Sequence, residues 1–138
     1  MNWLQLALLS ASFAGLVAIF GKLGMKDVDA ATATTARALV MLCALALLTA
    51  AQGKLEQLTR FSMQAWLYIG LAGLAGAASW LCYFQALKVG QASRVAPVDR
   101  LSTVITIALS VIFLGETITW KLGLGALLII GGSILVAL

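Results

Sequence analysis

The sequence contains no histidine, a single proline, two cysteines, and only nine basic and five acidic side chains in 138 residues. The lack of histidine removes the side chain that most often acts as a general base or a metal ligand. Cys43 and Cys82 lie alone in apolar stretches, a spacing that gives no metal site. We therefore expect two buried free thiols, no disulfide, no metal and no other cofactor. No nucleophile–base pair is present either, so an enzyme is disfavoured.

The chain has few charged residues and many hydrophobic ones. Charged residues make up 10% of the chain and hydrophobic residues 62%, and the mean hydropathy is +1.05. A soluble domain has about a quarter of its residues charged, so this composition disfavours a soluble enzyme, a disordered tail and a nucleic-acid module. The net charge of +4 is spread over single residues. Without a basic patch we expect no nucleic-acid partner. The lipid bilayer is the expected surroundings.

Apolar segments of the length that crosses a bilayer fill most of the chain. A transmembrane helix needs roughly 20 such residues, and five segments qualify: Leu4–Gly21, Ala31–Ala51, Trp66–Leu87, Val95–Leu114 and Lys121–Leu138. We predict an all-α integral membrane protein in which residues 1–138 form one transmembrane domain. Met1–Gln5 contains no Lys or Arg, so we interpret the first span as a retained helix and not as a signal peptide.

The distribution of basic residues among the loops hardly favours either orientation of the chain in the membrane. With the N-terminus inside, the inner and outer loops carry three and four of them respectively: Lys54, Arg60 and Lys121 against Lys22, Lys26, Lys88 and Arg94. The positive-inside rule needs a larger difference. Either loop details decide the orientation, or the chain inserts both ways and pairs with its own inverted copy. The odd number of spans also suits an inverted partner.

Three ionisable residues lie inside predicted spans: Arg37, Asp99 and Arg100. Such residues are costly in hydrocarbon and are functional candidates for that reason. Arg37 and Asp99 lie at similar depths in spans that begin on the same side of the membrane, so we predict that they pair. The alternative is structural: the arginines extend to the headgroups, and an Asp99–Arg pair only joins two helices.

The fourth span carries a polar stripe. Asp99, Ser102, Thr103, Thr106 and Ser110 share one face of the predicted helix. This stripe either lines an aqueous path for a substrate or ion, or its hydroxyls bond to backbone carbonyls and neighbouring helices. Pro97 falls in the predicted first turn, where its missing N–H is tolerated. A kink near a site is the other interpretation of this proline.

The third span combines an aromatic surface with small residues. Ser79, Trp80 and Tyr83 share one side of the helix, and we include them in the candidate pathway. Glycines recur in the third and fifth spans, and small residues allow close approach of helices. We interpret them as a helix-packing or dimer face: Gly70, Gly73 and Gly76 in span three, and Gly123, Gly125, Gly131 and Gly132 in span five.

The last three spans carry more specific motifs. The run Tyr83–Ser93 (YFQALKVGQAS) continues into Val95–Ser102 (VAPVDRLS), followed by Phe113–Thr117 (FLGET) and a glycine-rich final helix. This pattern resembles the EamA repeat of the drug/metabolite transporter superfamily, and Arg37 in span two also fits. The resemblance covers the whole chain, is strong over residues 83–132 and is looser before them.

The resemblance implies a single-repeat, five-helix member of that family. Such a chain would be a secondary transporter of a small metabolite or drug-like solute, multi-pass in the cell inner membrane. It would alternate access as a homodimer, inverted if both orientations occur. The four-helix multidrug members carry an essential Glu in their first helix, which is missing here, so Asp99 is the only intramembrane carboxylate for proton coupling. Glu116, in the "GE" step, is expected to cap the last span, with contact to the substrate as the alternative role.

A function of a different class also fits the sequence. The chain could be a non-transporting membrane subunit that assembles with or stabilises another membrane complex, and the glycine faces suit that function equally well.

Overall fold

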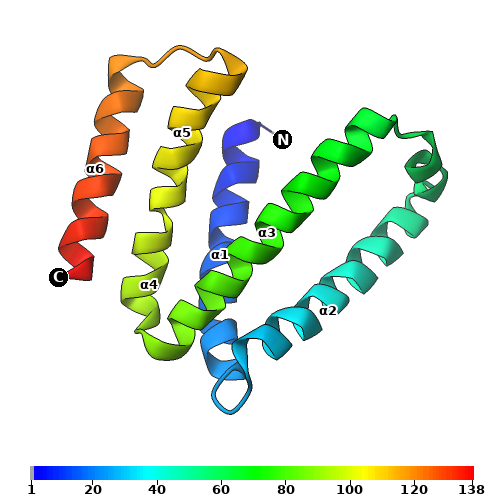
Figure 1. Cartoon of the computed structure of the whole chain (residues 1–138), viewed down its shortest axis with the longest axis horizontal. Coiled ribbons are helices and arrows are strands. Elements are labelled where there is room, and N and C mark those ends of the chain that lie inside the picture. The colour runs from blue at the N-terminus through cyan, green and yellow to red at the C-terminus, as the bar shows by residue number, and fades with distance from the viewer. Residues whose placement is uncertain (1) are drawn as a thin grey trace. The chain divides into compact units, whose positions relative to one another are not determined.

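The computed structural model describes residues 2–138, which form helices joined by short connections and contain no strand (Figure 1). The elements are α1 (Trp3–Gly24), α2 (Ala30–Ala51), the 3₁₀ helix η1 (Leu55–Arg60), α3 (Met63–Val89), α4 (Ala92–Asp99), α5 (Leu101–Leu114) and α6 (Trp120–Ala137). The predicted all-α class is confirmed.

Five helical stretches are long and apolar enough to cross a membrane: Trp3–Gly24, Ala30–Ala51, Met63–Val89, Ala92–Leu114 and Trp120–Ala137. The prediction of five spans is confirmed, and their ends differ from the predicted ones by at most three residues.

Polar side chains fix where two of these spans begin. The Asp29 carboxylate accepts hydrogen bonds from the backbone N–H of Ala31 (2.9 Å) and Thr32 (3.2 Å), so α2 begins directly after it. The hydroxyl of Thr119 accepts from the N–H of Leu122 (3.3 Å) in the same way at α6. The expected capping role of Glu116 is therefore wrong, because α6 begins four residues later and Thr119 occupies the cap.

The fourth span consists of two helical segments, α4 and α5, that meet at Arg100. Pro97 lies inside α4, whose first residue is Ala92, so the expectation of a proline in the first turn is wrong. Around the junction, backbone hydrogen bonds join residues three positions apart, as in a 3₁₀ helix. The Arg100 N–H donates to Pro97 O (3.2 Å), and the Thr103 N–H donates to Arg100 O (3.0 Å). A proline in a helix interior removes a backbone donor and crowds the preceding turn, and this accounts for the irregularity.

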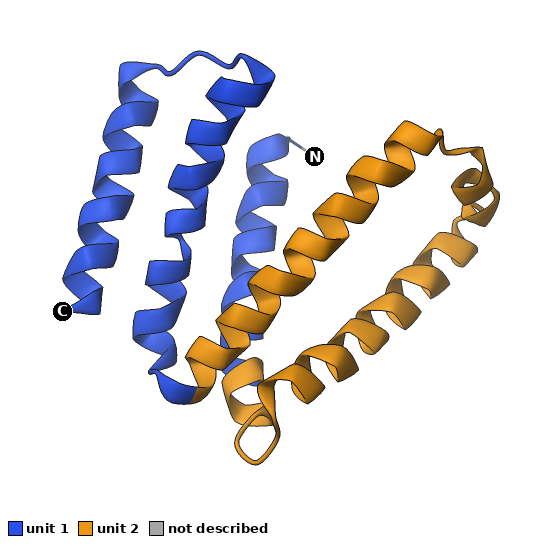
Figure 2. Ribbon diagram, viewed as in Figure 1, with its two compact units in different colours: residues 1–20, 89–138 blue, residues 21–88 orange. Residues whose placement is uncertain are grey.

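The chain divides into two compact units (Figure 2). One comprises residues 21–88, with the last turn of α1, α2, η1 and nearly all of α3. The other comprises residues 1–20 and 89–138, with the rest of α1 and α4, α5 and α6.

In the unit of residues 21–88, the end of α3 packs against the connection between α1 and α2. Phe84 and Leu87 are buried there, together with Met25 and Ala30. The Lys22 ammonium donates to the carbonyl of Leu87, and the Lys88 ammonium donates to the carbonyl of Val28 (3.2 Å). These lysines satisfy carbonyls that have no partner inside a helix.

In the other unit, α6 packs along α4 and α5. Ser133 of α6 is 4% exposed, and its hydroxyl donates to the carbonyl of Pro97 at 2.9 Å. A hydroxyl from a neighbouring helix thus serves the backbone at the irregular junction, which is how membrane proteins accommodate a proline in a span.

Most side chains of the described residues are exposed in the isolated chain. The buried ones are few: Ala18, Met25, Ala30, Phe84, Leu87 and Ser133. Cys43 and Cys82 are free, as expected, but both are exposed, so the expectation that they are buried is wrong. They lie on apolar helix surfaces that the chain does not cover by itself.

Candidate functional site

A cavity of about 640 Å³ lies between α2 and α3, inside the unit of residues 21–88. Its volume is within the range of about 300–1,000 Å³ that is typical of small-molecule sites. Arg37 is the one charged side chain in a wall that is otherwise apolar or hydroxylic. The wall is formed by Ala31, Thr34, Thr35, Arg37, Ala38, Met41, Leu42, Leu45, Gly73, Gly76, Ala77, Trp80 and Leu81.

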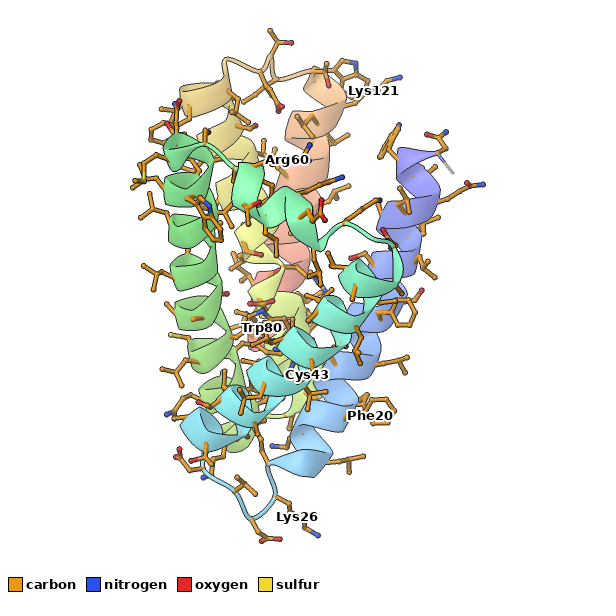
Figure 3. The ribbon with its side chains drawn as sticks, turned by 90° about the vertical axis from the view of Figure 1, so that its right-hand side faces the viewer. Phe20, Lys26, Cys43, Arg60, Trp80 and Lys121 are labelled. Atoms are coloured by element: carbon orange, nitrogen blue, oxygen red, sulfur yellow. The ribbon has the colours of Figure 1, made fainter. Side chains whose placement is uncertain are left out.

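The Arg37 guanidinium stacks on an aromatic ring across this cavity. Its central carbon lies 3.6 Å from the centroid of the Trp80 ring and 5.5 Å from that of Phe84. Figure 3 labels Trp80 in the space between α3 and α2. The structure therefore brings together two of the predicted site residues, Arg37 and Trp80, that are far apart in the sequence.

The cation–π contact with Trp80 offsets only part of the cost of an arginine inside a membrane helix. Placing an arginine inside a membrane helix costs about 2.5–3.5 kcal/mol on insertion scales. A cation–π contact returns about 0.5–2 kcal/mol. The difference, roughly 0.5–3 kcal/mol, is a deficit that the rings do not cover. An anion in the cavity would offset it.

A cluster of rings holds Trp80 in place. Its centroid lies 5.6 Å from those of both Tyr83 and Phe84, the former contact being edge-on. Gly21 of α1 lies against Phe84, and a Cβ atom at that position would overlap the Phe84 ring. The close approach of α1 to α3 thus requires glycine at this position.

Two threonines of α2 complete the polar part of the cavity. The hydroxyl of Thr34 donates to Ala30 O (2.7 Å), and that of Thr35 donates to Ala31 O (3.0 Å). Their protons are thereby used inside the helix, while their oxygens can still accept. Sequence reasoning missed both residues, although Thr34 lies three positions before Arg37 and so shares its helix face.

Gly73 and Gly76 line the cavity, and none of the three candidate glycines of α3, Gly70 included, has an atom within 4 Å of the position that a Cβ would occupy. Among the described residues these glycines therefore leave open space and make no close helix contact. Gly125, Gly131 and Gly132 are equally open, and Gly123 approaches only Ile118. Whether these glycines form a dimer face stays a prediction. Ser79 is exposed and is not part of the cavity wall.

The polar stripe of the fourth span lies in the other unit. Two of its hydroxyls bond within α5: Thr106 donates to Ser102 O (2.9 Å) and Ser110 to Ile107 O (3.0 Å). Ser102, Thr103 and Thr106 are exposed in the isolated chain. Backbone bonding, one of the two interpretations of the stripe, therefore occurs, and it leaves the hydroxyl oxygens accessible as acceptors.

Asp99 and Arg100 are exposed and lie at the junction of α4 and α5. Asp99 is seven residues after the first residue of its span, and Arg37 is seven residues after the first residue of α2. Each therefore lies about 10 Å along its own helix. The two residues belong to different units, and their pairing stays a prediction. Ser133, which holds the junction, was missed, because one serine in an apolar helix does not reveal its partner.

Comparison with known proteins identifies a family model and one relative that match the chain along nearly its whole length. Residues 1–138 match the model of the EamA-like transporter family. A protein of Sinorhizobium sp. named an uncharacterized transporter in the cobO 3′ region is 43% identical over 136 residues, which cover 99% of this chain and 96% of that protein. An uncharacterized protein of Methanocaldococcus jannaschii is 43% identical over 58 residues, 42% of each chain. No solved structure gives a significant match.

Proposed function

This chain belongs to the EamA-like transporter family, and from that premise we propose that it is a secondary transporter of a small metabolite or drug-like solute that works by alternating access. It is a multi-pass membrane transporter of the cell inner membrane.

The observation that carries the proposal is the cavity between α2 and α3 with its single charged side chain, Arg37. An intramembrane cation is retained where it faces a partner, a substrate or water. Here it faces a cavity of about 640 Å³ whose other walls are mostly apolar. Such a cavity, with a few polar groups that fix orientation, is typical of a small-molecule site.

The exposed polar stripe supports a dimer. Ser102, Thr103 and Thr106 of α5 are uncovered in the isolated chain. The carboxylate of Asp99 is poorly accommodated by lipid tails, and hydroxyls in membrane helices often bond to a neighbouring helix. A second copy that covers this face, or an aqueous path between two copies, would keep these polar groups out of the lipid. The junction at Arg100 is consistent with transport, since irregular spans in transporters occur beside substrate and ion sites.

The first experiment is transport by the purified chain in proteoliposomes. A thermal-shift screen of amino acids, amines, sugars and organic acids selects solutes for uptake assays. We expect Asp99→Asn, Ser102→Ala and Thr106→Ala to lower uptake while membrane abundance holds. If these changes are silent and only glycine substitutions in α3 and α6 have an effect, the non-transporting subunit is the correct function.

The inverted arrangement of the dimer has its own test. Because the basic loop residues divide three against four, we expect both orientations in the membrane. Topology reporters fused after Leu138 should be active on both sides. A signal from one side alone would remove the inverted dimer, and transport by a parallel dimer would then be examined by cysteine cross-linking.

We also propose that Arg37 and Asp99 pair while no solute is bound, since each lies seven residues into its span. Arg37→Asp and Asp99→Arg should each reduce the folded protein in the membrane. The double variant, which exchanges the charges, should restore a large part of it. Equal loss in the double variant at normal expression would remove the pair.

A further inference from the structure

We propose that the cavity between α2 and α3 binds the carboxylate of a monoanionic organic acid with an apolar body, and that Arg37 is the residue that holds it. The inference rests on the proposed function and names the class of solute. It follows from the geometry of the guanidinium, the single charge of the cavity and the chemistry of its wall.

The stacked geometry leaves the hydrogen-bonding edge of Arg37 available. A guanidinium donates its five N–H groups in its own plane. With its central carbon 3.6 Å from the Trp80 centroid, Arg37 has its face on the indole, and that contact uses none of these donors. Within residues 21–88, the described contacts of Arg37 are with aromatic rings. A carboxylate matches the in-plane pair of donors in a bidentate manner.

The charge balance of the cavity selects a monoanion. Its wall contains one cation and no Asp or Glu. One carboxylate neutralises Arg37, whereas a phosphate dianion would leave an excess negative charge in a medium of low polarity. A cationic amine would be repelled by Arg37, and no carboxylate in the wall would offset that repulsion. The ammonium group of an amino acid would find hydroxyl oxygens but no carboxylate, so a simple acid should bind better than an amino acid of the same size.

The wall also determines the rest of the ligand. Met41, Leu42 and Leu45 of α2 lie on one side, and Leu81 of α3 lies on the other. These side chains suit an aliphatic or aromatic body, whose burial is favourable in proportion to its apolar area. The expected ligand is thus an amphipathic acid with its carboxylate on Arg37 and its hydrocarbon along the leucines.

The test uses three probes that differ in one group: 4-phenylbutyrate, its neutral amide and 4-phenylbutylamine. Binding is measured by calorimetry on the purified full chain in detergent at pH 7. We expect the acid to bind about ten- to a hundred-fold more tightly than the amide, the range for a hydrogen bond to a charged group, and the amine to bind most weakly. Arg37→Gln should remove the preference for the acid and leave the amide unchanged. The matched control is Arg60→Gln, which removes an exposed arginine of η1 outside the cavity wall.

A second pair of variants keeps the test decisive if Arg37→Gln does not fold. Ala77 lines the cavity and its neighbour Ala78 does not, although both are exposed in the isolated chain. Ala77→Leu should fill part of the cavity and weaken binding of the acid, whereas Ala78→Leu should have no effect. Equal effects of the two substitutions would overturn the proposal. Equal affinity for acid and amide in the unmodified protein would overturn it as well.

Uptake of labelled 4-phenylbutyrate into proteoliposomes separates this inference from the proposed function. If the acid binds through Arg37 and no solute crosses the membrane, the binding site stands and the transporter function fails. If an amine or a sugar is transported while the acid does not bind, the transporter stands and the carboxylate site is wrong.

Discussion

Replacing Ser133 by alanine should destabilise the unit of residues 1–20 and 89–138 by a small and measurable amount. The side chain is 4% exposed, and its hydroxyl donates to the carbonyl of Pro97 at 2.9 Å. Alanine leaves nearly the same volume filled, so the loss is that of the hydrogen bond. It is the bond by which α6 holds the irregular junction of the fourth span.

The size of the loss in stability depends on the hydrogen bonds that the Pro97 carbonyl keeps in the variant. Pro97 O also accepts the N–H of Arg100 at 3.2 Å, so it does not lose its last partner. Hydrogen bonds between membrane helices contribute about 0.6 kcal/mol on average and at most about 1.7 kcal/mol. We therefore expect Ser133→Ala to lower the free energy of unfolding by about 0.5–1.5 kcal/mol. A fully unpartnered buried carbonyl would cost more.

The assay is unfolding of the purified chain in mixed micelles by increasing fractions of sodium dodecyl sulfate, followed by circular dichroism. Ser110→Ala is the matched control, because its hydroxyl is also partly buried but donates to Ile107 O (3.0 Å) in its own helix. That carbonyl lies inside a regular helix and does not depend on the serine. If Ser133→Ala is as stable as wild type and as Ser110→Ala, the bond to Pro97 does not hold the junction.

Two further predictions concern the unit of residues 21–88. Gly21→Ala should lower the free energy of unfolding by about 1–3 kcal/mol, because the new methyl group overlaps the Phe84 ring and forces it to move; unfolding in mixed micelles measures this. The pKa of Asp29 lies below its ordinary value, chiefly because the N–H of Thr32 donates to the carboxylate. Its contribution to stability is therefore complete above about pH 4 and is lost as the pH falls through the lowered pKa. Asp29→Asn keeps a capping oxygen but cannot titrate, so its melting temperature should fall less than that of wild type between pH 6 and pH 3.

Each of these predictions has a control in the same part of the chain. Gly24→Ala adds a methyl group where no atom lies within 4 Å, so a loss equal to that of Gly21→Ala would show that overlap with Phe84 is not the cause. Asp27→Asn removes a nearby carboxylate that is not the cap of α2. If it reduces the pH dependence as much as Asp29→Asn does, the cap is not responsible.

The sequence predicts the spans well because hydropathy and length are local properties. All five spans are confirmed, and Asp29 and Thr119 cap the beginnings of two of them. For the junction in the fourth span the sequence left two interpretations of Pro97, a tolerated first-turn proline and a kink, and it favoured the first. The effect of the proline depends on where the helix begins, and α4 begins three residues before the predicted start, which moves the proline into the interior.

The sequence predicted individual residues of the candidate site but not the contacts between them. Arg37 and Trp80 stand out singly as a charge and an aromatic ring inside spans, but their contact depends on how α2 and α3 pack. Gly73 and Gly76 show the limit most clearly, since small residues permit close packing and equally permit an open space. Here they line a cavity. That outcome depends on how two helices pack against each other, which the spacing of glycines along one helix does not show.

The stacking of Arg37 on Trp80 has an optical consequence. The emission of an indole responds to the electric field around its ring, and the Arg37 guanidinium, with its central carbon 3.6 Å from the centroid, contributes to that field for Trp80. The other three tryptophans, Trp3, Trp66 and Trp120, lie at the beginnings of α1, α3 and α6. With those three replaced by phenylalanine, the remaining fluorescence would come from the cavity alone. The chain thus contains its own spectroscopic reporter of what approaches the arginine, with no added label.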